Sequence, residues 1–406
     1  MTPEIETLRR ALPVAALLAL GACTQAPSVD DRGEWLPGAT MAAESFSGER
    51  AWAHLLALSE LGPRPSGSAA AQEAFEYLRS RLESSPKLQA FELVLPQPDA
   101  EAAGADAAAG AKAADSGPLA RHLVARLPGA SPDSILLLAH YDTLAGSPGA
   151  NDGASGAAVL LELARQLAER PLHYTVEIVF LDNEMGIDEK KPTTPLLQGS
   201  QLLAERLRDD GTLDEVRLVL ALRQVGDAEL TIGRDLLSHR IHRETFFEAA
   251  ADLGLGAAFP TNRGFVELVA SHTPFRAVGM PRGVALMDPW YGGDPPPGTF
   301  WGGEADTPER CSEDSLRAVG VVALAGLRRI SEQLQKIDLV SGRAARRRGE
   351  ILEPAQAMPA EEVLEEAPDP SEGASPAPGG GLEAEEPPAE APSGATEEAV
   401  PAPESS

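Results

Sequence analysis

The chain has 406 residues, of which 43% are hydrophobic and 24% are charged, and its formal net charge is -28. The hydrophobic content is ample for a large buried core. The acidity, together with the lack of a basic face interleaved with aromatic side chains, argues against nucleic-acid binding.

Residues 1–23 are predicted to form a bacterial signal segment. Two arginines precede the apolar stretch Ala11 to Leu20, which is too short to span a membrane. The sequence Leu-Gly-Ala-Cys that follows resembles a lipobox, so we expect cleavage before Cys23, lipid attachment to this cysteine, and a linker over residues 24–43. This predicts a lipid-anchored protein of the cell envelope, on the periplasmic or surface side of the outer membrane in a Gram-negative cell. The alternative is a secretory signal with an incidental cysteine.

Hydrophobic periodicity predicts one α/β domain over residues 44–341, with a flexible Ala-rich insertion at 100–117. Helices are expected up to Leu61 and at Ala69–Glu83, Gly153–Ala168, Gly199–Leu207, Ile241–Ala251 and Glu313–Ser331, with a short one opening at His272. Strands are expected at Gln89–Leu95, His122–Leu127, Ile135–Ala139, Val176–Leu181, Val216–Leu222 and Gly283–Met287. This order favours a three-layer sandwich in which helices cover both faces of a mixed, mainly parallel sheet.

The segment ILLLAHYDT, followed by GANDGASG, carries the clearest chemical signal. Ligand sites of such sheets lie at the carboxyl ends of the strands, where this segment places His140, Asp142 and Asp152. An imidazole backed by one carboxylate, plus a second carboxylate on a tight turn, suits a hydrolytic zinc site. His140 would be a ligand, Asp142 its orienting partner, and Asp152 a ligand able to bridge two metals. The alternatives are a strand-end histidine at 140 and a helix N-cap at 152.

These motifs and those around them resemble metallopeptidase family 28, the zinc aminopeptidases and their glutaminyl cyclase relatives. The similarity runs from about Ala51 to about Glu332, and the ordered matches are LGPRPSGS, LVARLPG, HYDT, GANDGASG, VFLDNE, VGD, SHTPF and ADTPERCSEDSL. The resemblance implies a zinc-exopeptidase-like fold with an eight-stranded sheet. It also implies Glu184 as general base or acid, and zinc bound by His140, Asp152, His272 and two further carboxylates.

The two further ligand positions are substituted, because they hold Met185 and Arg223. Three of the five ligands of a two-zinc site remain, or two of the three ligands of a one-zinc site, whereas catalytic zinc normally keeps three protein ligands. Arg223 places a permanent cation where the resemblance implies a dication. We expect its guanidinium to pair with Asp152 and Glu184.

Simpler interpretations stand beside these. Glu184 would be a solvated loop carboxylate, Met185 a packing residue, and His272 an ordinary exposed residue at a helix start. A further alternative is that nearby polar side chains replace the missing groups. Asp188 or Glu189 would supply a displaced metal ligand, and Glu304 would supply a replacement polar group. Ser271 stands where the family usually has an aspartate, and Trp301-Gly302-Gly303 replaces its Trp-His-Thr.

Residues 342–406 are predicted to form a disordered acidic tail. Beyond Arg348 they lack lysine and arginine and consist largely of Glu, Pro, Ala, Gly and Ser, which cannot bury enough surface to fold. If Cys23 carries lipid, Cys311 alone remains, and no intramolecular disulfide can form.

The leading hypothesis is a membrane-anchored pseudoenzyme with a degenerate metal site. Zinc would bind weakly or not at all. The cleft at the degenerate metal site would bind peptides, protein N-termini or a partner. An active zinc aminopeptidase or glutaminyl-peptide cyclotransferase is the second hypothesis, and a structural envelope component is the third, so the sequence leaves catalytic activity open.

Overall fold

The computed structural model describes residues 46–95, 120–188 and 191–343. The chain divides into two units, Met1–Arg348 and Gly349–Ser406, and all described residues belong to the first. The signal segment with Cys23, the linker and the Ala-rich insertion lie outside the described residues, as does the tail apart from Gly342 and Arg343. None of the described helices combines the length and the apolarity needed to cross a bilayer.

The structure confirms the α/β class, with a central sheet in the order β1-β2-β4-β3-β7-β10. These strands are β1 (Gln89–Leu95), β2 (Ala120–Leu127), β3 (Ser131–His140), β4 (Tyr174–Leu181), β7 (Val216–Arg223) and β10 (Gly283–Met287). β3, β4, β7 and β10 run parallel, while β1 and β2 pair in antiparallel fashion at one edge. The sheet is therefore mixed and mainly parallel.

The eight strands implied by the family resemblance are not all present in the described ranges, where the central sheet has six. Four short segments pair separately from it: β5 (Ile187–Asp188) with β6 (Lys191–Pro195), and β8 (Arg234–Asp235) with β9 (Phe265–Val266). Three of the four have only two residues, so each forms a small pairing in a loop rather than extending the main sheet.

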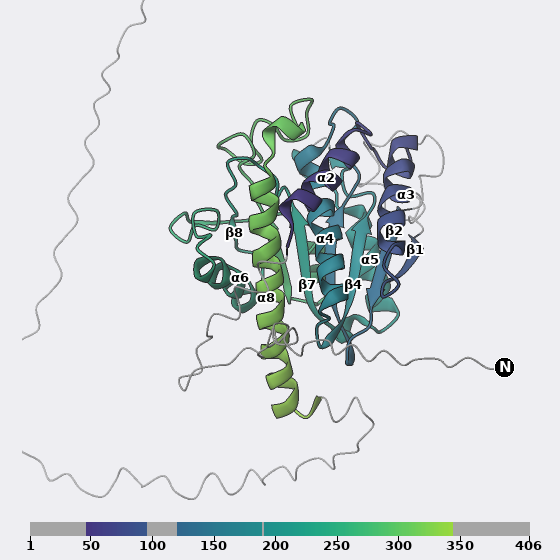
Figure 1. Cartoon of the computed structure of the whole chain (residues 1–406), viewed down its shortest axis with the longest axis vertical. Coiled ribbons are helices and arrows are strands. Elements are labelled where there is room, and N and C mark those ends of the chain that lie inside the picture. Colours follow the sequence, from purple (N-terminus) through teal and green to yellow (C-terminus); the bar gives the residue numbers. More distant parts are fainter. Residues whose placement is uncertain (1–45, 96–119, 189–190, 344–406) are drawn as a thin grey trace, which may run out of the picture. The chain divides into compact units, whose positions relative to one another are not determined.

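Helices cover both faces of the sheet, because successive strand residues point to opposite sides. On one face Leu137, Ile178 and Leu220 join a core shared by several helices. These helices are α2 (Gly48–Ser59), α3 (Ala69–Glu83), α4 (Gly156–Glu169), α6 (Arg240–Asp252) and α8 (Glu313–Val340). Figure 1 shows α8 running in front of the sheet beside α4.

The opposite face has a smaller core. Leu138 and Val179 pack there with residues of α5 (Gln198–Asp209) and α7 (Thr273–Ala277). The two cores together give the expected three layers.

The C-terminal helix α8 extends nine residues beyond its expected end at Ser331, to Val340. Sequence periodicity fades there because Ile337, Leu339 and Val340 are exposed. A buried carboxylate holds the last turns instead. Asp338 accepts a hydrogen bond from the Tyr174 hydroxyl at 2.7 Å and pairs with Arg217.

Candidate functional site

The parallel strands bring their last residues to one edge of the sheet. His140 pairs with Leu181, and Arg223 pairs with Met287, so these strand ends lie at one level. Two residues that follow strands, Asn183 and Gln224, have φ of 62° and 51°, in the left-handed region that non-glycine residues rarely adopt. Such strained residues cluster at functional sites.

Asp152 lies in a wide turn, Ala150–Ser155, that precedes α4. It does not cap the helix, which corrects that expectation, because α4 starts at Gly156 rather than Gly153 and Ser155 is its first flanking residue. Gly153 has φ of 124°, and a Cβ there would lie 2.8 Å from the Asp142 carbonyl oxygen. The turn therefore requires glycine at 153, and it leaves the Asp152 carboxylate free to face the sheet edge.

Asp306 holds this turn from the other side. Its carboxylate accepts hydrogen bonds from the backbone N–H groups of Asn151 at 2.7 Å and Asp152 at 3.1 Å, and from the Tyr291 hydroxyl at 3.1 Å. Burial raises the pKa of Asp306 to about 6.

Arg223 binds Asp152 at two points. Its Nε donates to Oδ1 and its Nη2 to Oδ2, both at 2.9 Å, and both side chains are almost fully buried. The expected Arg223–Asp152 pair is thus present. The expected contact with Glu184 is not among the hydrogen bonds or ion pairs of Arg223; its Nη2 instead lies 3.2 Å from the sulfur of Met185.

Two further groups surround the Asp152 carboxylate. His140 Nε2 lies 3.1 Å from Oδ1, and the indole N–H of Trp301 donates to Oδ2 at 2.6 Å. Burial lowers the pKa of His140, but hydrogen bonds with Asp142 and Asp152 outweigh this effect and raise it to about 9. Asp152 is therefore an ionised carboxylate between two cations, with its pKa held well below its usual range despite burial.

Asp142 lies beside His140, as expected for an orienting partner, but the closer contact to Nδ1 is its backbone oxygen at 3.0 Å rather than its carboxylate at 3.5 Å. Its Oδ2 accepts hydrogen bonds from the backbone N–H groups of Glu184 and Met185, both at 2.9 Å. Asp142 thus fixes the start of the loop after β4.

Glu184 is fully buried, so the interpretation as a solvated carboxylate is wrong. Its carboxylate accepts hydrogen bonds from the Ser200 N–H, from the Ser200 hydroxyl at 3.1 Å, and from the Ser271 hydroxyl at 2.6 Å. Burial is the largest influence on its pKa, which is raised. Met185 is also buried, in keeping with its interpretation as a packing residue.

His272 is buried too, so its interpretation as an ordinary exposed residue is wrong. The structure does not bring it to His140 and Asp152. Its ring lies against Gly283 at the amino end of β10, whereas Arg223 pairs with Met287 at the other end, about 13 Å along the strand. Its Nε2 lies 2.9 Å from the buried Asp235 carboxylate, which draws the ring away from the site.

The side chains present do not fit a zinc centre of the kind that the sequence resemblance implies. Both oxygens of Asp152 are bound by Arg223, position 185 offers only a thioether, and His272 lies elsewhere. The described part of the chain has no group of three or more His, Cys, Asp or Glu side chains placed to hold a metal. Glu304 is exposed and does not replace a ligand. Glu189, and the side chain of Asp188, lie outside what the structure describes.

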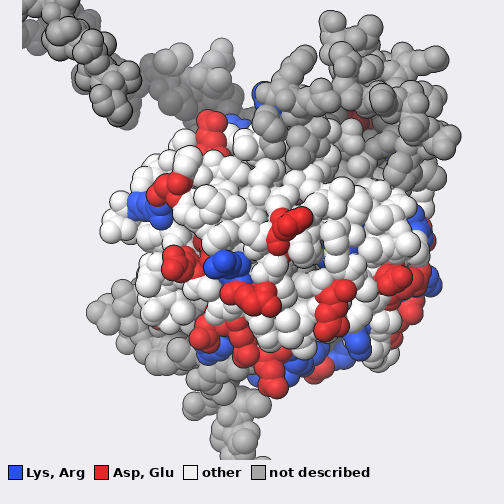
Figure 2. Space-filling view, turned by 90° about the horizontal axis from the view of Figure 1, so that it is seen from above, with Lys and Arg blue, Asp and Glu red and all other residues white. Residues whose placement is uncertain are grey.

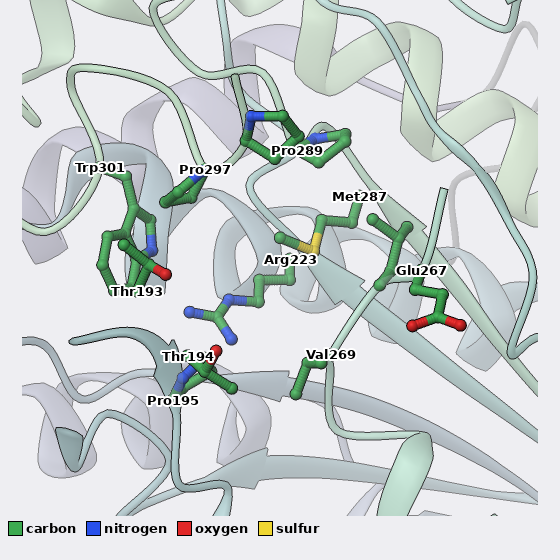
Figure 3. Close-up of a pocket in the computed structure, with 12 residues that line it drawn as sticks. Thr193, Thr194, Pro195, Arg223, Glu267, Val269, Met287, Pro289, Pro297 and Trp301 are labelled. Atoms are coloured by element: carbon green, nitrogen blue, oxygen red, sulfur yellow. The ribbon is translucent and has the colours of Figure 1, made fainter. Parts of the chain in front are cut away.

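A pocket of about 190 Å³ opens beside this cluster, with Arg223 among its lining residues. Figure 3 shows the guanidinium projecting between Trp301 and two threonines, Thr193 and Thr194. The pocket belongs to the edge of the sheet where the parallel strands end. Figure 2 views the molecule from above and shows acidic and basic side chains scattered among uncharged residues on the described surface.

Several members of this site are not predictable from the sequence. Asp306 stands in the motif ADTPERCSEDSL, but the sequence does not show that its carboxylate binds the backbone N–H groups of Asn151 and Asp152. Trp301 supplies a donor to Asp152 where the family's Trp-His-Thr is altered. Asp235 and Ser200 had no sequence signal, because their partners are distant in the chain.

Comparison with known proteins finds a matching family profile and two curated relatives. The profile of Peptidase family M28 matches residues 122–327. The uncharacterized protein YFR018C of Saccharomyces cerevisiae is 29% identical over 209 residues, 39% of this chain and 57% of that protein. Aminopeptidase YwaD of Bacillus subtilis is 44% identical over 57 residues, 14% of this chain and 12% of that protein. The chain thus matches less than two thirds of either relative.

Solved structures share the fold. An Acidobacteriales bacterium glutaminyl cyclase has a TM-score of 0.59 at 23% identity, covering 76% of this chain and 98% of its own. A Porphyromonas gingivalis glutaminyl cyclase has a TM-score of 0.57 at 25% identity, over 71% and 99%. A Zn-dependent exopeptidase from Parabacteroides distasonis has a TM-score of 0.55 at 21% identity, over 69% and 97%.

Proposed function

Because the chain belongs to peptidase family M28, a family associated with zinc, we propose that its folded domain is a pseudoenzyme, which has lost metal-dependent catalysis and uses the old cleft to bind a peptide. Zinc would bind weakly or not at all.

The observation that carries this proposal is the two-point ion pair between Arg223 and Asp152. A dication placed about 4 Å from the guanidinium would be repelled by roughly 8 kcal/mol at an effective dielectric constant of 20. Asp152 would also have to give up two charge-assisted hydrogen bonds before it could bind a metal. The charge of Arg223 thus takes over the role that a metal ion would have beside this carboxylate.

Glu184 supports the same proposal from the side of proton transfer. It occupies the position that the family resemblance assigns to the general base or acid, yet Ser200 and Ser271 bind its carboxylate. In this chain those bonds tie the loop after β4 to α5 and to the segment before α7. The glutamate therefore has a structural role without any metal.

Turnover of N-terminal glutaminyl and aminoacyl peptides tests the proposal. With zinc added, we expect the full chain to give no product above the level of its Glu184→Gln variant. The matched control is the double variant Met185→Glu, Arg223→Asp, which restores two carboxylates to the substituted positions and should bind zinc more tightly than the natural chain. Zinc-dependent turnover by the natural chain that is lost in Glu184→Gln would instead support an active aminopeptidase or cyclotransferase.

Binding to the pocket separates this proposal from a purely structural envelope role. A substitution inside the pocket should abolish peptide binding and leave the fold intact. A purely structural component would show no peptide binding that such a substitution could abolish.

A further inference from the structure

Arg223 has hydrogen-bond donors that the protein does not use. Its Nε and Nη2 are bound by Asp152, and Nη2 also contacts Met185, but Nη1 is buried without a hydrogen-bond partner among the described residues. The side chain is only 2% exposed. A buried donor on a charged group that lacks an acceptor is costly, so an acceptor that enters the site is favoured.

The pocket in front of Arg223 has walls suited to a small carboxylate. Thr193 and Thr194 contribute hydroxyl groups, and Trp301 and four prolines contribute apolar surface. Figure 3 shows the guanidinium aimed into this space, with Pro289 and Pro297 above it. Glu267, the acidic residue of the lining, lies on the other side of the pocket from the guanidinium.

We infer that this pocket binds the carboxylate of a peptide, with Arg223 Nη1 and the two threonine hydroxyls as the donors. The inference rests on the proposed function and names its ligand class. A guanidinium with free N–H groups recognises a carboxylate by charge-assisted hydrogen bonds, and it repels the ammonium of a peptide N-terminus.

The size of the pocket limits the ligand further. Its volume of about 190 Å³ is below the roughly 300 Å³ at which pockets begin to enclose drug-sized ligands. It therefore accommodates one terminal residue or one acidic side chain, while the rest of the peptide lies outside the pocket.

Isothermal titration calorimetry with the natural full chain tests the inference without any substitution. The probes are N-acetyl-Ala-Pro-Ala with a free C-terminal carboxylate, the same peptide with a C-terminal amide, and an amidated peptide with glutamate as its last residue. We expect the free acid to bind at least ~10-fold more tightly than the amide. If the amidated glutamate peptide binds, the pocket recognises a side-chain carboxylate. If only the free-acid peptide binds, the pocket recognises the C-terminal carboxylate. Equal affinity for acid and amide, or no binding of any carboxylate probe, would overturn the inference.

Two variants locate the binding site. Thr194→Val removes one hydroxyl donor and should weaken binding of the preferred carboxylate probe several-fold, by about the contribution of one hydrogen bond. Glu267→Gln is the matched control from the same lining, and it should leave that binding unchanged or tighten it. Unchanged binding in Thr194→Val, or equal losses in both variants, would contradict the inference. Zinc-dependent turnover by the natural chain would overturn the proposed function, whatever these titrations show. If the chain shows neither turnover nor carboxylate binding, only the inferred ligand class is overturned.

Discussion

The guanidinium of Arg223 and the carboxylate of Asp152 form the interaction on which this site depends. Both groups are almost completely buried, and the pair satisfies them at two points. A buried pair adds little net stability relative to well-packed apolar residues, but the loss of one partner leaves the other charge uncompensated.

The strength of this coupling is measurable by a double-mutant cycle. Arg223→Met should lower the free energy of unfolding by ~3–5 kcal/mol, because Asp152 would keep a buried charge with fewer partners. Adding Asp152→Asn should recover part of that loss, so the double variant is more stable than the sum of the single effects predicts. Urea denaturation of the four proteins gives the answer, and strictly additive losses would rule out the coupling.

Asp288 gives the domain a predicted pH dependence. Burial raises its pKa to about 7, so the folded state holds a proton that the unfolded chain, with an ordinary carboxyl pKa, has already released. Its contribution to stability therefore falls as the pH rises from the unfolded pKa of about 4 to the folded pKa of about 7, so a loss is expected between pH 5 and pH 7. We expect Asp288→Asn to flatten this part of the stability curve relative to the natural chain, by ~1–3 kcal/mol over that range. Thermal melts at pH 5, 6, 7 and 8 measure it, and parallel curves for both proteins would refute the assignment.

Among the elements, the loop after β3 depends on one buried cation. The fully buried Arg64 donates to five backbone carbonyl oxygens within and beside this loop. The acceptors are those of Leu58, Gly62, Tyr141, Pro148 and Gly149. Arg64 thereby joins the end of α2 to the segment that leads to Asp152.

Arg64→Met tests this role. It should destabilise the domain by about 3 kcal/mol or more, because it leaves buried carbonyl groups without donors. The control is Arg79→Met on α3, whose ion pair with Glu83 is exposed on both sides and should matter little. A small effect of Arg64→Met in chemical denaturation would show that the loop is held by other contacts.

Elements with a clear apolar period were predictable from the sequence, and long-range side-chain placement was not. The bounds of α3, β1 and β10 agree with the expected ranges, since each has a regular pattern between turn residues. Helix α4 starts at Gly156 rather than at the expected Gly153, because the local sequence does not reveal that Asp306 binds the backbone of the turn before it.

The candidate site shows the same division. His140, Asp152 and Arg223 meet because they stand at the ends of adjacent parallel elements, which the strand pattern predicts. His272 was expected to join them. Its ring faces Asp235 instead, and this carboxylate comes from a two-residue strand that has no periodic signal.

At the scale of the whole molecule, we propose that lipid on Cys23 anchors the chain in the cell envelope. Cys23→Ser should move the protein from the membrane fraction to the soluble fraction of the envelope, because stable anchoring needs the acyl chains. Fractionation followed by immunoblotting measures this, with Cys311→Ser as the control that keeps the lipobox. Membrane association of Cys23→Ser equal to that of the natural chain would contradict lipid anchoring.

A crystal of the natural chain grown with zinc, measured at the zinc absorption edge, tests the central claim most directly. The account predicts no anomalous peak beside Asp152, with Nε and Nη2 of Arg223 still bound to its carboxylate. An ordered zinc ion bound to Asp152, with the guanidinium displaced, would contradict it.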